Sequence, residues 1–364
     1  MCFSFSYTTV CFRGILISKG YINSRSLCLS VITVLLETRF LFDEAKEQLS
    51  NATACDGSLI VEHASMEESM IKLTDGRTLN YAVYGPVTGT PILYFHGTPS
   101  SRLELLLLNN YGMDIEQLLH ETNLKVIAVD RPGMGLSTFN KNGTFLSFAS
   151  DAKELLVYLN IKNCPVLCWS GGGPYALAMA HQYPNVIIQV FIICGFTRRF
   201  NKDLVSEMGM NKWYFRSAKY TPFLLGTALS IIKKKKVTSA VSQKFTGLPD
   251  EDHALLKDVK HLSGLLNFTV KEACRRGIKG AVHDAGSYFT HFGFDVKNIH
   301  QPITYWWGTK DNAVTGIHAT TIENETVNGT VLRKSNEGHL SLYINYMKEV
   351  LQTIASSVGL KIEQ

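Results

Sequence analysis

The sequence predicts an α/β protein with a mostly parallel eight-stranded sheet, flanking helices and a helical segment inserted between two central strands. Short apolar, β-branched stretches alternate with amphipathic stretches at the spacing of strand–helix units. The stretch 186–194 is apolar almost throughout, as expected of a strand that is buried on both faces of a parallel sheet. The next expected strand begins only at residue 303, and the intervening segment 196–302 is too long for a plain loop.

The expected strands are short apolar runs bounded by turn residues, and they start near residue 70. They are 70–73, 79–84, 91–95, 125–129, 165–169, 186–194, 303–307 and 330–333. The expected helices carry apolar residues at helical spacing, and Asp114 is placed to cap the first of them. They are 114–121, 145–159, 172–182, 221–232, 251–266, 269–276 and 340–355.

These elements divide the chain into three parts. We expect an α/β core from 66–195 and 303–364, a helical cap from 196–302, and an N-terminal extension from 1–65. The extension has no acidic residue before Glu37 and is rich in Ser, Cys and Phe, which is compatible with organellar targeting. The alternative is a disordered extension or a weakly docked first helix at 31–48. We favour this alternative, because the apolar patch at 27–36 lies too far into the segment for a signal peptide. The expected location is therefore cytoplasmic.

Composition excludes several classes of protein. The chain has 364 residues, of which 45% are apolar and 18% charged, so it is neither disordered nor, with a formal charge of +5, a typical nucleic-acid binder. No apolar run reaches the length of an integral membrane span. The eight cysteines form no CxxC pair, which argues against a zinc site or a thioredoxin-like motif. Three of the last four lie in strongly apolar stretches, and a chain of this length can build its core without disulfides, so we expect reduced thiols. The reaction expected from the motifs of this chain needs no metal or organic cofactor. Four consecutive lysines, 233–236, fit a solvated helix end or contact with an anionic lipid or substrate, and we favour the first.

The strongest chemical signal is a serine between an expected strand and an expected helix. The residues Cys168-Trp169-Ser170-Gly171-Gly172-Gly173-Pro174 follow the strand 165–169 and open the helix 172–182. A serine on such a sharp turn needs small neighbours, and Gly171 and Gly172 supply that room. Cys168 stands where the usual G-x-S-x-G motif has its first glycine. The segment is thus either a nucleophile turn or an ordinary glycine-rich turn, and we favour the nucleophile.

A serine nucleophile needs a base, and the base needs an orienting acid. His339 lies between the last expected strand and the closing helix, and Asp311 follows the strand 303–307. Both therefore follow carboxyl ends of strands, the edge at which open α/β sheets place their sites. The order Ser170, Asp311, His339 is the chain order typical of one such fold. The alternative is that His339 is a surface histidine and Asp311 a turn residue.

Acyl chemistry also needs donors for an oxyanion. The backbone N–H of Gly171 is one candidate. The second candidate is the N–H of Thr98, because Gly97 lets the loop after the strand 91–95 come close and Pro99 has no N–H. His96, in the same loop, is expected to be structural.

Taken together, these motifs resemble the α/β-hydrolase superfamily over about residues 68–358, and in detail its capped serine hydrolases with proline iminopeptidase-like and small esterase-like members. The resemblance rests on His96-Gly97-Thr98-Pro99, Asp130-Arg131-Pro132-Gly133-Met134-Gly135-Leu136-Ser137, the Ser170 turn, Phe292-Gly293-Phe294-Asp295, Asp311 and Gly338-His339. It implies hydrolysis through an acyl-serine intermediate. Ser170 stands where haloalkane dehalogenases and epoxide hydrolases have an aspartate, and the loop at 96–100 is less glycine-rich than that of iminopeptidases, which makes peptidase activity less expected.

We therefore expect a serine hydrolase of a small, fairly apolar ester, thioester or amide. Ser170, Asp311 and His339 are the expected catalytic residues, with Thr98 and Gly171 as oxyanion donors. Two alternatives stay open: a non-catalytic binding protein on a hydrolase fold, and a lyase or acyltransferase that uses the same three residues. The substrate and the oligomeric state are not determined by the sequence.

Overall fold

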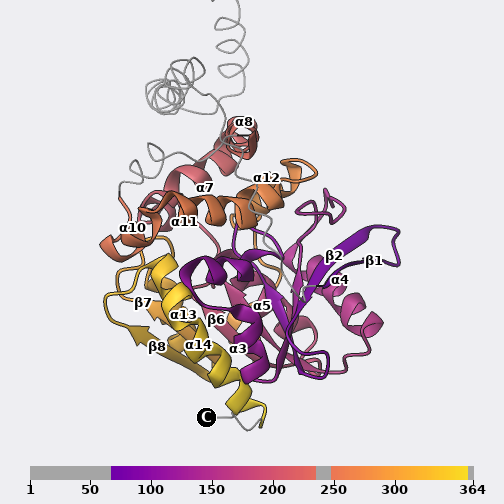
Figure 1. Cartoon of the computed structure of the whole chain (residues 1–364). Coiled ribbons are helices and arrows are strands. Elements are labelled where there is room, and N and C mark those ends of the chain that lie inside the picture. The colour runs from indigo at the N-terminus through magenta and orange to yellow at the C-terminus, as the bar shows by residue number, and fades with distance from the viewer. Residues whose placement is uncertain (1–66, 235–246, 360–364) are drawn as a thin grey trace, which may run out of the picture. The chain divides into compact units, whose positions relative to one another are not determined.

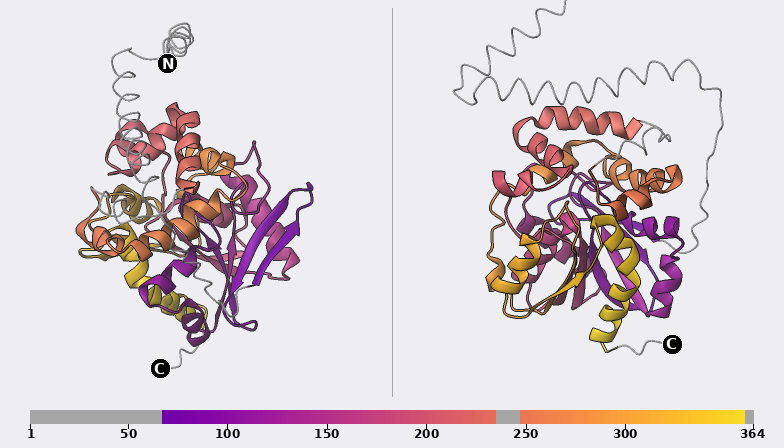
Figure 2. Two further views of the ribbon diagram at one scale, coloured as in Figure 1. Left: turned by 45° about the horizontal axis from the view of Figure 1, so that its top comes forward. Right: turned by 90° about the vertical axis from the view of Figure 1, so that its left-hand side faces the viewer.

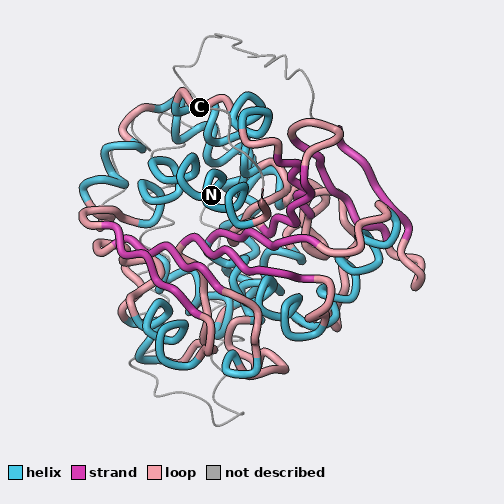
Figure 3. Tube along the Cα trace, turned by 90° about the horizontal axis from the view of Figure 1, so that it is seen from below, coloured by secondary structure: helices cyan, strands magenta, loops and turns pink. Residues whose placement is uncertain are grey.

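A computed structural model of the chain contains one twisted eight-stranded sheet, with helices on both of its faces (Figure 3). The strands are β1 Glu67–Lys72, β2 Thr78–Tyr84, β3 Thr90–Phe95, β4 Leu124–Val129, β5 Cys164–Trp169, β6 Ile187–Ile193, β7 Ile303–Gly308 and β8 Gly329–Lys334. Their order across the sheet is β1-β2-β4-β3-β5-β6-β7-β8. Only β2 runs antiparallel to its neighbours, and every pair from β4 to β8 is parallel. The predicted fold class is confirmed.

The structure describes residues 67–234 and 247–359. The expectations for residues 1–65, including a helix at 31–48, lie outside this part of the chain, as do Lys235 and Lys236. Within the described residues, no helix has both the length and the apolar character needed to cross a bilayer. The four cysteines that the structure describes are free and buried, as expected for reduced thiols; they are Cys164, Cys168, Cys194 and Cys274.

The helices of the core connect successive strands. They are η1 Glu104–Tyr111, α3 Ile115–Glu121, α4 Phe145–Tyr158, η2 Ser170–Gly172, α5 Gly173–Gln182, α13 Ile317–Glu325 and α14 His339–Ser357. Asp114 caps α3 as expected, because its side chain accepts the Gln117 N–H. α4 packs against α5, and α14 packs against β6 and β7. The sequence did not predict η1 or α13.

Between β6 and β7, the described residues of the segment 196–302, here called the helical insertion, form helices. They are α6 Lys202–Ser206, α7 Asn211–Tyr220, α8 Pro222–Lys234, α10 Asp250–Leu256, α11 Val259–Leu266, η3 Asn267–Lys271, α12 Lys279–Ser287 and η4 Val296–Asn298. In Figures 1 and 2 the helices α7, α8, α10, α11 and α12 lie at the end of the sheet opposite the C-terminus, whereas η4 leads directly into the start of β7. The insertion therefore covers the edge at which the parallel strands end.

Two predicted helices of the insertion are wrong in detail. The helix expected over 251–266 is two helices, because Asp258 is extended between them and its side chain accepts the Lys260 N–H at 2.7 Å. An aspartate that bonds to nearby backbone in this way favours a helix start over a helix interior. The helix expected over 269–276 overlaps a π-helical turn, Asn267–Lys271, instead. The helices α6, α7 and α12 were not predicted.

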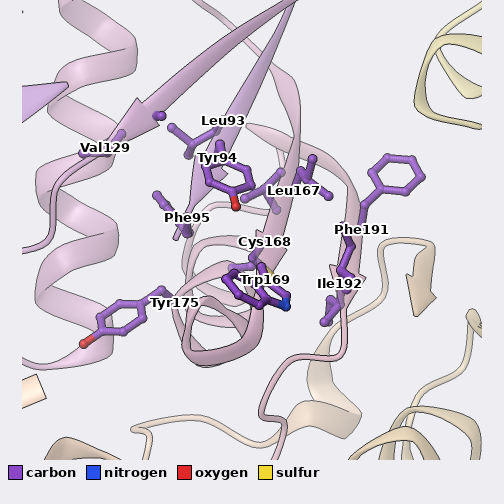
Figure 4. Close-up of a cluster of buried hydrophobic side chains, with 14 of the residues drawn as sticks. Leu93, Tyr94, Phe95, Val129, Leu167, Cys168, Trp169, Tyr175, Phe191 and Ile192 are labelled. Carbon is purple, nitrogen blue, oxygen red and sulfur yellow. The ribbon is translucent and has the colours of Figure 1, made fainter. Parts of the chain in front are cut away.

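The central strands are apolar because both of their faces are covered. All six residues of β5 are buried, and Figure 4 shows side chains of β3, β5 and β6 packed together around them. Tyr94, Cys168 and Trp169 belong to this cluster and lie toward the carboxyl ends of their strands. The core thus continues up to the edge of the sheet that carries the candidate residues.

A buried ion pair organises the loop after β4. Asp130 accepts the backbone N–H of Arg102 and its Nη1 group, both at 2.8 Å, and both side chains are fully buried. A Cβ atom at Gly135 would lie 1.9 Å from the Asp130 carboxylate, so this turn needs glycine. Asp130 thus shapes the loop that follows β4. Arg102 also pairs with Glu68 at 2.6 Å and with Glu272 at 2.8 Å, so loss of Asp130 removes one of three carboxylates from a buried guanidinium. It also leaves the buried backbone N–H of Arg102 without its acceptor.

We predict that Asp130→Ala lowers the free energy of unfolding by about 2–3 kcal/mol, because the Arg102 backbone N–H and one guanidinium contact lose their buried acceptor. Urea-induced unfolding followed by circular dichroism measures this difference. The control is Glu323→Ala, which removes an exposed ion pair with Arg333 and should cost no more than about 1 kcal/mol. Equal losses in the two variants would contradict the role of burial.

Candidate active site

Ser170 lies on a strained turn directly after β5. Its φ angle is +52°, in the left-handed region that L-residues rarely adopt. The turn is tight on the sheet side, since a Cβ atom at Gly172 would lie 2.3 Å from the carbonyl oxygen of Phe95. The same Cβ atom would lie 2.9 Å from Cβ of Cys168, so position 172 needs glycine on this side as well. The strand–turn–helix arrangement expected for a nucleophile is therefore present.

Asp311 and His339, 28 residues apart in sequence, are joined by a hydrogen bond. His339 Nδ1 donates to Asp311 Oδ2 at 2.8 Å. The other oxygen of Asp311 accepts the backbone N–H groups of Ala313 and Val314, each at 2.8 Å. These three donors fix the position of the Asp311 carboxylate relative to the imidazole. The pair leaves His339 Nε2 as the nitrogen available to a substrate or a nucleophile.

The electrostatic surroundings of His339 favour its protonated form. Burial by itself lowers the pKa of the imidazole, but the negative charges of Asp311, Asp252 and Glu104 outweigh it. The net result is a pKa above the ordinary value of 6.5. The imidazolium that forms when a base takes a proton is therefore stabilised in place.

Trp169 connects the serine turn to the histidine. Its indole ring stacks on the His339 ring with 5.2 Å between centroids, and on the Tyr343 ring at 4.3 Å. Because Trp169 immediately precedes Ser170, this stack places His339 beside the serine turn. No hydrogen bond joins the Ser170 hydroxyl to His339 within the described part of the chain. Such contacts are often long in unliganded enzymes, so the Ser170–His339 contact stays a prediction.

The loop after β3 lies against the serine turn. A Cβ atom at Gly97 would lie 3.4 Å from Cβ of Ser170, and one at Gly171 would lie 2.6 Å from Cγ2 of Thr98. Thr98 and Gly171 therefore adjoin on one side of the serine. Gly97 donates its N–H to Glu104 at 2.9 Å, and burial raises the pKa of Glu104 to about 7 despite this and other hydrogen bonds. Both expected oxyanion donors are thus close to Ser170.

His96 has the structural role expected of it. Its Nδ1 lies 2.8 Å from the carbonyl oxygen of Gly97, and its Nε2 accepts the backbone N–H of Arg131 at 3.4 Å. Burial and the neighbouring Arg131 hold the pKa of the imidazole well below its usual range. A neutral imidazole with both ring nitrogens in hydrogen-bonding contacts shapes the loop, and it is poorly suited to act as the catalytic base.

Sequence reasoning missed Asp284, a residue of the insertion that anchors this loop. Its buried carboxylate accepts hydrogen bonds from the hydroxyl groups of Thr98 and Tyr175, and forms an ion pair with Arg131 at 3.0 Å. Tyr288, one turn further along α12, donates its hydroxyl to the carbonyl oxygen of Gly171 at 2.8 Å. No local pattern marks Asp284, because all of these partners except Tyr288 are more than 100 residues away.

Asp252 was also missed, and it anchors the other half of the site. It lies on α10, yet its carboxylate accepts the N–H groups of His339, Leu340 and Ser341 at 2.8, 3.1 and 2.8 Å. It therefore caps α14, the helix that begins with His339, from a different part of the chain. A Cβ atom at Gly338 would lie 2.5 Å from this carboxylate, which explains the glycine before the histidine.

One cluster within the described residues has the composition of a cation site. The ligand atoms of Cys194, Asp311 and His339 lie within 4.8 Å of one another. His339 and Asp311 are already bonded to each other, and the Cys194 thiol faces the backbone carbonyl of His339 at 3.7 Å. Burial also raises the pKa of this thiol well above its usual value, which disfavours the thiolate that a metal requires. The atoms fit a hydrogen-bonded arrangement better than a metal centre.

Comparisons with known proteins agree with the fold. A family model described as alpha/beta hydrolase fold matches residues 90–346. An uncharacterized hydrolase of Bacillus subtilis, YcgS, is 25% identical over 71% of this chain and 86% of its own length. A putative proline iminopeptidase of Mycoplasma genitalium is 28% identical over 40% of this chain, and that match spans less than half, 46%, of the Mycoplasma protein.

A solved structure has a similar architecture. This chain superposes on a crystal structure from a study of carboxylesterases of Nitrososphaera gargenis with a TM-score of 0.58. The match covers 80% of this chain and 97% of the other chain, and the two are 18% identical in sequence. At this level of identity the likeness shows the fold alone.

We predict that His339 titrates above pH 6.5 and that Asp311→Asn lowers its pKa. The imidazolium–carboxylate pair stabilises the fold fully below pH 6.5, and this contribution is lost as the pH rises through the folded pKa. NMR titration of the His339 ring protons measures the pKa directly. The exposed substitution Asp295→Asn serves as the control and should leave it unchanged. A His339 pKa below 6.5 in the wild-type protein would contradict the prediction.

Proposed function

The chain belongs to the alpha/beta hydrolase fold family, and from this premise we propose that it is a serine hydrolase acting through an acyl-serine intermediate. The observation that supports this most directly is the 2.8 Å hydrogen bond between His339 and Asp311, beside a serine held on a strained turn. The three residues follow the carboxyl ends of β5, β7 and β8. This is the edge of the sheet where α/β folds carry out chemistry.

The proposed reaction has two halves. In the first, Ser170 Oγ attacks the acyl carbon while His339 Nε2 takes its proton, and the bond to the leaving group then breaks as His339 returns that proton to it. In the second, water attacks the acyl-serine by the same route and releases the acid. Asp311 keeps the proton of the neutral imidazole on Nδ1 and stabilises the imidazolium formed in each half.

The negative charge that develops on the acyl oxygen needs preorganised donors. We assign this role to the backbone N–H groups of Thr98 and Gly171. The assignment is supported by the close approach of the Thr98 side chain to Gly171 and of Gly97 to Ser170. Removal of one such donor typically costs about 2.7–4 kcal/mol of transition-state stabilisation. Asp284 supports the geometry, because it holds the Thr98 side chain in place from the insertion.

We further propose that the insertion, residues 196–302, acts as a cap over the site. Three of its buried side chains bond to elements of the site: Asp252 to the start of α14, Asp284 to Thr98, and Tyr288 to Gly171. A docked cap excludes bulk water, and this strengthens the electrostatic interactions inside the site. The cap would also set the size of the acyl group that is accepted.

The proposed substrate is a small, fairly apolar ester, thioester or amide. The relatives include proteins named as a putative proline iminopeptidase and, in Xenopus laevis, as an sn-1-specific diacylglycerol lipase. The second of these is 29% identical over 30% of this chain. We favour ester over peptide substrates because the loop at 96–100 departs from the iminopeptidase pattern.

We predict that Ser170→Ala abolishes both hydrolysis of p-nitrophenyl acyl esters and labelling by a fluorophosphonate probe. Loss of the nucleophile in a serine triad lowers kcat by roughly 10⁶-fold. A chromogenic rate assay and gel detection of the probe measure the two effects. Ser356→Ala, at an exposed position of α14, is the matched control and should behave as the wild type.

An unchanged rate in Ser170→Ala would exclude this mechanism. If folded wild-type protein shows neither labelling nor hydrolysis, the result would favour the binding-protein alternative. Transfer of the acyl group to an added alcohol, seen by product analysis, would identify an acyltransferase.

We predict that Asp252→Ala lowers ester hydrolysis by roughly tenfold, because an unanchored helix start displaces His339. Asp252→Asn keeps one acceptor oxygen and should retain more activity. Asp311, Asp252 and Glu104 all raise the His339 pKa, so loss of the Asp252 charge should also move the acid limb of the kcat/KM profile to lower pH. A merely structural defect would lower the rate without moving this limb, and that outcome would contradict the assigned role.

A further inference from the structure

The outer surface of the insertion exposes large apolar side chains on two adjacent helices. Phe223 and Tyr220 are 79% and 57% exposed, and both lie where α7 ends and α8 begins. Met210, Trp213 and Ile232, on the same two helices or directly before them, are exposed as well. We call this surface, with its basic neighbours, the α7–α8 face. In Figures 1 and 2, α8 lies at the end of the described unit farthest from the C-terminus.

The same face carries a concentrated positive charge. Residues 208–234 contain five basic residues and no acidic one. The segment therefore has a formal charge of +5, the same as the formal net charge of the whole chain. The five are Lys212, Arg216, Lys219, Lys233 and Lys234. None forms an ion pair with a described residue. Some lie against the aromatic rings instead: Lys212 and Arg216 are 5.8 and 5.9 Å from the Trp213 ring centroid, and Lys219 is 5.2 Å from that of Tyr220.

A groove with a mainly apolar lining and a volume of about 960 Å³ opens beside this face. Phe223 belongs to both, and Ile278 and Val282, at the start of α12 and within it, also line the groove. Ser170, Asp311 and His339 do not line the groove, so it is a separate feature from the candidate active site. It is nevertheless close, since Phe145 lines the groove and its ring lies 5.8 Å from that of Tyr288, which bonds to Gly171.

We propose that the α7–α8 face docks the protein onto the surface of a lipid bilayer that contains anionic lipids. Exposed aromatic side chains on a short amphipathic helix enter the boundary between head groups and acyl chains, and neighbouring lysines and arginines bind anionic head groups. The face provides both components with no acidic side chain among them. α8 would lie in the plane of the membrane with Leu225 and Leu229 still buried in the protein. The groove would then open toward the acyl chains.

A second copy of this chain fits the same face poorly. In a symmetric dimer, the five positive charges of one copy would face the five positive charges of the other. The segment 208–234 has no acidic residue that could pair with them. An acidic macromolecule would satisfy the charge but would leave the apolar side chains of Met210, Phe223 and Ile232 without a matching surface. A bilayer with anionic head groups meets both requirements.

The test is sedimentation of the full-length protein with vesicles, and it needs no enzymatic activity. We expect binding to phosphatidylcholine vesicles that contain about 30 mol% phosphatidylserine, and weak binding to phosphatidylcholine alone. Binding should fall as salt rises from roughly 0.1 M to 1 M, because the Debye length shortens from about 10 to 3 Å. Failure of the proposed hydrolase activity would leave this result unaffected.

Two sets of substitutions separate the contributions. Phe223→Ser with Tyr220→Ser should lower vesicle partitioning by at least about tenfold, through loss of buried apolar area. Lys212→Gln, Arg216→Gln and Lys219→Gln together should lower it roughly 100-fold on anionic vesicles. The matched controls lie elsewhere on the surface: Val157→Ser with Tyr158→Ser, and the triple change Lys72→Gln, Lys162→Gln and Lys297→Gln. The controls should bind within a few-fold of the wild type.

Equal binding to neutral and anionic vesicles, or no binding to either, would overturn the proposal. So would equal losses in the test and control variants. If the wild type instead forms dimers in gel filtration, and the two test sets of substitutions abolish them, the face is an interface between copies of the chain and the membrane assignment is wrong.

Discussion

The hydrogen bond from His339 Nδ1 to Asp311 Oδ2 joins the turn after β7 to the start of α14, and the rest of the site is arranged around it. Asp311 is held by two backbone N–H groups of its own turn, so the imidazole is the partner that must be placed correctly. Two contacts place it: the Trp169 ring stacks on one side, and the start of α14 fixes the backbone. The serine turn is connected to both through Trp169.

The insertion contributes to the site as much as the core does. Asp252 and Asp284 are both buried acids on its helices, and each satisfies polar groups of a different core loop. A buried carboxylate without partners is costly, as are uncapped helix N–H groups at a buried helix start. The buried carboxylates of the insertion and the N–H and hydroxyl groups of the core therefore form these hydrogen bonds only when the insertion is docked in this position. This arrangement links the position of the insertion to that of His339 and Thr98.

The two sides of the insertion differ in chemistry for a physical reason. Its inner side carries acidic groups, whose partners are N–H groups, hydroxyls and the Arg131 guanidinium. Its outer side over residues 208–234 carries only basic groups, interleaved with aromatic rings. Charges on the inner side are neutralised within the protein, whereas those on the outer side are left to the surroundings. The proposed roles of cap and membrane contact use these two sides separately.

The sequence by itself determined the strands, the parallel class of the sheet and the chain order of Ser170, Asp311 and His339. These follow from local signals: apolar runs, turn glycines, and the rule that parallel strands end at one edge. Only the tertiary structure decided the roles of Asp252 and Asp284 and the exposure of the aromatic and basic side chains of α7 and α8. Asp252 and Asp284 bond to groups 87 and 186 residues away, at His339 and Thr98, and no local pattern encodes such a pairing. Exposure also depends on tertiary packing. The sequence of α8 does not tell which of its apolar residues are covered, whereas in the structure Leu225 and Leu229 are buried and Phe223 is exposed.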